Sequence, residues 1–81
     1  MKPLDENNPY AKCLVSLVVS ISNQIPMEKE NTVLILMQLN TEKKIMTFSK
    51  WIESRMSGET LNATETEIMR ASTRISKGLE P

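Results

Sequence analysis

Histidine is missing from this 81-residue sequence, and Cys13 is its single cysteine. Serine nucleophiles normally need a histidine to activate them, and no residue spacing marks out a serine with another base. Structural zinc sites use cysteine and histidine, and rarely carboxylates alone. The two glycines, Gly58 and Gly78, cannot form the glycine-rich loop that cradles a phosphate. The sequence therefore predicts no catalytic, cofactor or metal site, and an enzyme is the least favoured class.

The lone cysteine also excludes an intramolecular disulfide framework. A secreted domain of this size usually needs disulfides, so Cys13 indicates a reducing compartment, and we expect it to be a small buried side chain. The apolar run at 13–22 is interrupted by serines and is shorter than the about 20 residues that span a bilayer. Asp5 and Glu6 precede it, where a signal peptide would carry positive charge. These features predict a cytoplasmic protein without a membrane partner.

Neither sign of charge is in excess, because ten basic side chains balance ten acidic ones. A strongly basic nucleic-acid binder or a polybasic membrane binder would show a surplus. Aromatic residues are also scarce, with one each of phenylalanine, tryptophan and tyrosine. Because two glycines and four prolines leave little material for tight hairpins, the composition favours helices.

Hydrophobic spacing predicts an all-α fold, a compact four-helix domain. The expected helices lie near 9–24, 27–39, 41–57 and 64–77. They form a single helical domain at 9–78, between a flexible N-terminal segment at 1–8 and a C-terminal tail at 79–81.

Local capping signals support these boundaries. Asn8 followed by Pro9 is a typical helix start. Asn40 or Thr41 is expected to cap the third helix, and Gly58 is expected to end it with a positive φ. Thr64 and the glutamate three residues later match a capping box for the fourth helix.

The segment 31–40, NTVLILMQLN, is apolar at nearly every position. A buried strand at 32–39 is the alternative, but the leucine and methionine content and the acidic residues before it favour a helix. A helix that is apolar all round is normally buried, and a chain of this length offers few neighbours to cover it. Either the other three helices enclose it, or a partner does.

Association is the favoured solution. The first helix carries Val15 and Val19 outside its main apolar stripe, and we expect them to form an interface with Ile35 and Leu39 of the second helix. The partner is expected to be a second copy, most simply in a two-fold homodimer, or another protein.

Basic residues on the third helix suggest a different partner. Lys43, Lys44, Thr47 and Lys50 would contact DNA if the second and third helices formed a helix-turn-helix. The turn lacks glycine, however, and a solvated outer face explains the same pattern. The basic residues of the fourth helix, Arg70, Arg74 and Lys77, are explained by the helix dipole.

The function favoured by the sequence is thus binding. We expect a small non-enzymatic protein-binding module, such as an adaptor, inhibitor or regulatory subunit, that self-associates through its first two helices. A dimeric helix-turn-helix DNA-binding regulator is the alternative.

Overall fold

The computed structural model describes residues 9–81, which contain four α-helices and one short β-hairpin. The expected all-α, four-helix fold is confirmed. The expected flexible segment 1–8, including the Asn8 cap, lies outside the described residues. Within 9–81, no helix combines the length and the hydrophobicity needed to cross a bilayer. In chain order, the elements are α1 (Pro9–Gln24), α2 (Lys29–Gln38), α3 (Glu42–Ser54), β1 (Met56–Ser57), β2 (Thr60–Leu61) and α4 (Glu65–Ser76).

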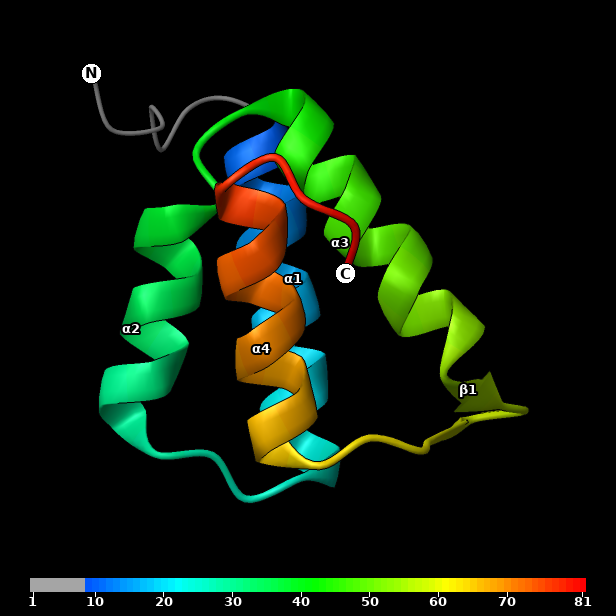
Figure 1. Cartoon of the computed structure of the whole chain (residues 1–81). Helices are drawn as coiled ribbons and strands as arrows, with labels where there is room; N and C mark the ends of the chain where they lie inside the picture. The colour runs from blue at the N-terminus through cyan, green and yellow to red at the C-terminus, as the bar shows by residue number, and fades with distance from the viewer. Residues whose placement is uncertain (1–8) are drawn as a thin grey trace.

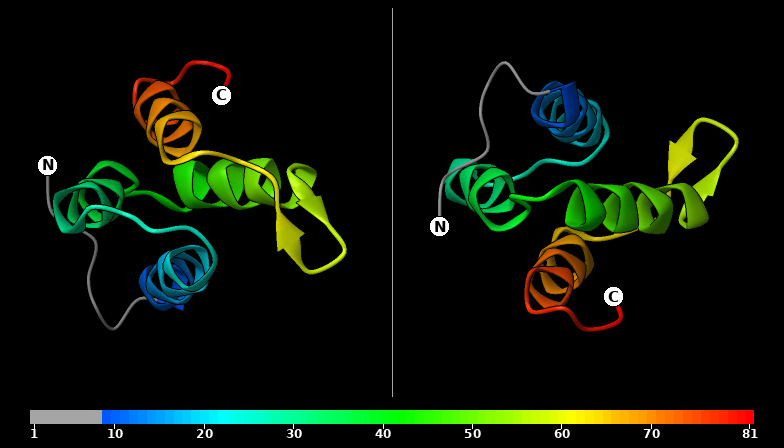
Figure 2. Two further views of the ribbon diagram at one scale, coloured as in Figure 1. Left: turned by 90° about the horizontal axis from the view of Figure 1, so that it is seen from below. Right: turned by 90° about the horizontal axis from the view of Figure 1, so that it is seen from above.

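Three of the helices run side by side and the fourth crosses them. α2 and α4 run in the same direction and α1 runs opposite to both, whereas α3 is inclined to all three (Figure 1). Viewed from below or above, α1, α2 and α4 appear nearly end-on while α3 lies lengthwise (Figure 2). α2 and α3 each contact both α1 and α4, which lie on opposite sides of the molecule.

The core lies where these helices meet. Phe48 is its one buried aromatic side chain, and aliphatic side chains supply the rest. Such burial contributes about 1.5–3 kcal/mol per large side chain, so the core holds the otherwise marginal helices together. The core cluster consists of Leu14, Val18, Ile21, Ile35, Leu39, Ile45, Phe48, Ile52, Leu61, Ile68 and Ile75.

Cys13 does not belong to this core, contrary to expectation. It is exposed, whereas Ala11 is buried together with Leu14 and Val18. The buried stripe of α1 is therefore rotated toward Ala11, and this rotation turns the thiol outward.

The segment 31–40 is helical over most of its length, as expected, and the strand alternative is wrong. The interface prediction for Ile35 and Leu39 is also wrong, because both side chains are completely buried within their own chain. Ile35 lies on the inward face of α2, and Leu39, the C-cap residue, continues this face one turn later. Their burial leaves Val33, Leu34 and Met37 of the same segment outside.

The hairpin is the main difference from the expected fold. α3 ends at Ser54, and β1 pairs antiparallel with β2, with Met56 opposite Leu61 and Ser57 opposite Thr60. This register leaves a two-residue turn that begins at Gly58, whose φ of 61° confirms the expected positive value. Glycine at the first turn position matches the tight turns that join twisted strands.

Arg55 explains why α3 stops early. Its backbone carbonyl accepts a hydrogen bond from the Asn62 N–H (2.8 Å), and its Nε donates to the Asn62 carbonyl (3.0 Å). Its guanidinium also forms an ion pair with Glu67 of α4 at 2.6 Å. These contacts bring the chain back toward α4 and replace the final turn of the expected longer helix.

The N-caps predicted for α3 and α4 are present. The Thr41 side chain accepts from the Lys44 N–H at 3.3 Å, which fixes the start of α3. Thr64 and Glu67 form the reciprocal capping box of α4. These local contacts set the directions in which α3 and α4 leave the connecting segments.

Candidate interaction surfaces

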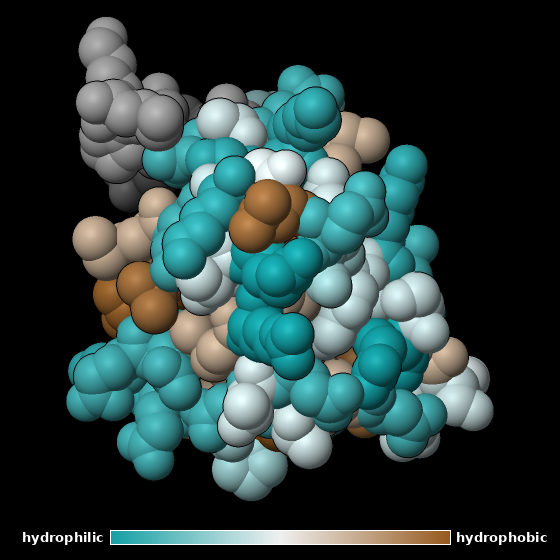
Figure 3. Space-filling view, in the orientation of Figure 1, coloured by the Kyte–Doolittle hydropathy of each residue, from teal (hydrophilic) through white to brown (hydrophobic). Residues whose placement is uncertain are grey.

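Five aliphatic side chains of α1 and α2 are left outside the core. Val15 and Val19 are 48% and 53% exposed, Val33 and Leu34 are 44% and 40% exposed, and Met37 is 69% exposed. We call this set the α1–α2 apolar face. Its α2 part is visible as hydrophobic surface over that helix in Figure 3.

Helical geometry brings the α1 part of this face beside α2. Leu17, Ser20 and Gln24 line a cavity that α1 shares with α3 and the hairpin, so the opposite edge of α1, with Val15 and Val19, is turned toward α2. The two helices are antiparallel and joined by residues 25–28. At 1.5 Å per residue, Val19 lies level with Val33, and Val15 with Met37.

Hydrogen bonds to α4 decide which side of α2 is exposed. Gln38 accepts from the hydroxyl of fully buried Ser72 at 3.0 Å, at the C-terminal end of α2. At the other end, the Glu65 carboxylate accepts from the Asn31 side chain (2.9 Å) and from the Glu28 N–H (2.6 Å). Both contacts lie on one side of α2, and this side therefore turns toward α4.

Glu65 supplies the cap that α2 lacks, since the side chain of its own N-cap residue, Glu28, makes no capping hydrogen bond. The pKa of Glu65 lies below its ordinary value of 4.5. The larger cause is the hydrogen bond that its carboxylate accepts from Asn31, and the second is the one from the Glu28 N–H. Desolvation opposes this shift without reversing it. The position of α2, and hence of the apolar face, is thus linked to the charged state of Glu65.

Two of the four predicted interface residues, Val15 and Val19, belong to this face. Ile35 and Leu39 do not, because they lie in the core. Sequence reasoning missed Val33, Leu34 and Met37 as the outer residues of α2. No periodic signal could identify them, because the apolar residues of this segment surround the helix on all sides.

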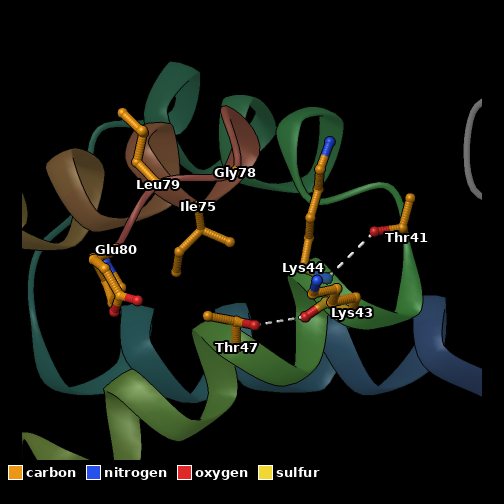
Figure 4. A pocket seen from close by; sticks show the side chains of 9 residues that line it. Thr41, Lys43, Lys44, Thr47, Ile75, Gly78, Leu79 and Glu80 are labelled. Atoms are coloured by element: carbon orange, nitrogen blue, oxygen red, sulfur yellow. Dashed lines mark hydrogen bonds between the residues drawn. The ribbon is translucent and has the colours of Figure 1, made fainter.

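The four residues of α3 predicted to contact DNA divide into two groups. Lys43 and Lys50 are exposed, whereas Lys44 and Thr47 are half-buried. Lys43, Lys44 and Thr47 line a pocket of about 310 Å³ that does not include Lys50. In Figure 4 the two lysines stand on one side of this pocket, opposite residues that follow α4.

No cluster of metal ligands forms among residues 9–81, where histidine, cysteine and carboxylate side chains do not gather in threes. No protein-family model matches the chain, and no curated protein or solved structure is significantly similar to it. The surfaces described above are therefore the basis for assigning a function.

Proposed function

We propose that this protein is a small non-enzymatic protein-binding module that self-associates through the α1–α2 apolar face. The observation that supports this proposal is the set of five half-exposed aliphatic side chains on two adjacent helices. Contiguous apolar surface of this kind on a small domain usually belongs to an interaction site. A second copy presents the same surface, so a two-fold arrangement would cover both at once.

We further propose that this module works in the cytoplasm. Cys13 is exposed, and in an oxidising compartment an exposed unpaired thiol readily forms intermolecular disulfides. A reducing compartment avoids this reaction.

The size of the apolar face predicts moderate affinity. Full burial of one such side chain contributes about 1.5–3 kcal/mol, so five half-exposed side chains would contribute about 5 kcal/mol per protomer. Association costs about 4–15 kcal/mol in lost freedom of motion. The two protomers together gain about 10 kcal/mol, so a cost near the low end of this range leaves about 6 kcal/mol, which corresponds to a dissociation constant of about 40 μM. We therefore expect a weak dimer whose population depends on concentration in this range.

Light scattering coupled to gel filtration tests this proposal. The measured mass should rise from that of the monomer toward that of the dimer as the protein is concentrated. Replacing Val15 and Val19 together with glutamate should abolish this rise, because both carboxylates would have to be desolvated in the interface. Lys50→Glu, which makes the same change in net charge at an exposed position of α3, outside the face, should leave the rise intact. A wild-type protein that stays monomeric at several hundred micromolar would overturn the proposal.

DNA binding by α3 is the second candidate. Lys43 and Lys50 are exposed on α3, which follows α2 after only the three residues 39–41. This order and spacing are compatible with a helix-turn-helix. The exposed acids Glu42 and Glu53 on the same helix weaken the case.

An electrophoretic shift assay with a pool of random duplexes tests this candidate. Binding at low salt should fall steeply as salt is added, and it should be lost when Lys43 and Lys50 are both replaced by glutamate. Absence of a shift at low salt would exclude DNA binding by this helix.

A further inference from the structure

A second surface, separate from the apolar face, lies along the groove between α3 and α4. One end is the pocket of about 310 Å³ that contains Lys43 and Lys44, with Ile75 of α4 in its lining. The other end is a pocket of about 190 Å³ lined by α3 and α4, including Trp51 and Arg70. We call these two pockets together the α3–α4 groove. It lies on the side of α4 away from α2, so it does not overlap the apolar face.

The chain's own residues 79–81 lie in this groove. Gly78, with φ of 78°, ends α4, and the Leu79 N–H bonds back to the Arg74 carbonyl at 2.9 Å. The chain then turns from α4 toward α3, as the red segment in Figure 1 shows. Pro81 belongs to the lining of both pockets, so this short segment passes from one to the other.

The segment is held by its backbone. Arg74 Nε donates to the carbonyl oxygen of Glu80 at 2.6 Å, a contact that is independent of the side chain at position 80. Leu79 lines the same pocket as Ile75, which offers an apolar surface between the two helices. The groove therefore already holds a short chain segment by a main-chain contact beside an apolar position.

The walls of the groove are strongly basic for a chain with no net charge. Five basic side chains line it or border it, against two acids, Glu67 and Glu80, and Glu80 belongs to the segment 79–81 that occupies the groove. Glu67 is already paired with Arg55, whose guanidinium also lies 5.7 Å from the centre of the Trp51 ring. The basic side chains are Lys43, Lys44, Arg55, Arg70 and Arg74.

We propose that the α3–α4 groove binds an extended acidic peptide of a partner protein, in competition with residues 79–81. From Thr41 to Arg55 the groove follows about 20 Å of helix, which about six extended residues would span. The basic walls complement the carboxylates of the peptide, and an apolar residue of the peptide takes the place of Leu79 beside Ile75. The concave shape and the backbone contact of Arg74 suit a peptide, whereas duplex DNA is read by a helix that projects into its groove.

Fluorescence anisotropy with a defined probe tests this proposal. The probe is a fluorescein-labelled peptide of about six residues that alternates glutamate and leucine, to match the groove length estimated above. The full chain should bind it more weakly as salt is added. Reversing two charges, with Lys44→Glu and Arg70→Glu together, should raise the dissociation constant at least about tenfold. The matched control, Lys12→Glu with Lys29→Glu, makes the same change in net charge on α1 and α2 and should alter it less than about twofold.

The competing segment gives an independent test. Removing Glu80 and Pro81 keeps the Leu79 contact that ends α4 and clears the groove beside Arg74. The peptide should then bind about threefold more tightly or better, because fewer molecules have an occupied groove. Unchanged affinity after this truncation would overturn the competition.

Other results would overturn the groove as a peptide site. One is that the probe does not bind at low salt. Another is that a peptide with lysine in place of glutamate binds equally well. A third is that a labelled duplex of about 20 base pairs, about two helical turns, binds more tightly than the probe. Equal loss of binding in the groove variant and in its control would do the same.

Circular dichroism checks that the variants are folded, and Arg70→Gln alone is a milder variant of the same wall. A wild-type protein that is monomeric and still binds the probe would overturn self-association and leave the groove intact.

Discussion

Met37 offers the sharpest test of self-association, because it is the most exposed member of the α1–α2 apolar face, at 69%. Burying a whole methionine contributes about 1.5–3 kcal/mol, so covering this fraction contributes about 1–2 kcal/mol per protomer and about 2–4 kcal/mol per two-fold dimer. Each loss of about 1.4 kcal/mol weakens binding tenfold. Met37→Glu should therefore raise the dimer dissociation constant about 30-fold to about 1000-fold, as measured by sedimentation velocity over a range of concentrations.

The matched control is Met46→Glu. Met46 lies on α3, is also a large exposed hydrophobic residue at 46%, and receives the same charge in the variant. It should leave the dissociation constant within about twofold, because it is outside the face and only adds a distant, screened charge. Equal weakening by the two variants would mean that charge alone disperses the protein. No weakening by Met37→Glu would refute the assignment of α2 to the interface.

Three further predictions concern the fold that supports these surfaces. Ile35→Ala should destabilise the protein by about 2–5 kcal/mol in urea unfolding, whereas Val33→Ala, on the outer side of the same helix, should cost less than about 1 kcal/mol. Gly58→Ala should cost about 1–2 kcal/mol in the same assay, because φ is 61° there although a methyl group would meet no atom within 4 Å. The lowered pKa of Glu65 contributes stability that is present above its ordinary value of 4.5 and is lost as the pH falls through the lower folded value. Melting temperature should therefore fall on acidification through this range, and Glu65→Gln should make the fall shallower.

The α3–α4 groove joins residues whose roles could not be read from their positions in the chain. The lysines of α3 suggested a DNA contact, and the arginines of α4 suggested only a favourable dipole. Arg70 and Arg74 stand more than 25 positions after Lys44 in the sequence, so only the packing of α3 against α4 brings them to one groove.

Sequence by itself determined the helical architecture, because its signals are local. Pro9 begins α1 as expected, and the N-cap at Thr41 and the capping box at Thr64 each need only a residue three positions away. The hairpin escaped prediction because strands of two residues show no alternation. Its position depends on Arg55, which reaches Asn62 and Glu67 across the turn.

Only the tertiary structure decided which side of α2 faces solvent. Its apolar residues surround the helix, so the sequence offers no stripe that distinguishes Ile35 from Val33. The distinction comes from two hydrogen bonds at opposite ends of α2, from the Ser72 hydroxyl to Gln38 and from the Asn31 side chain to Glu65. These partners stand 34 positions apart in each case, and hydrogen bonds over such a separation exist only once α2 and α4 have packed together.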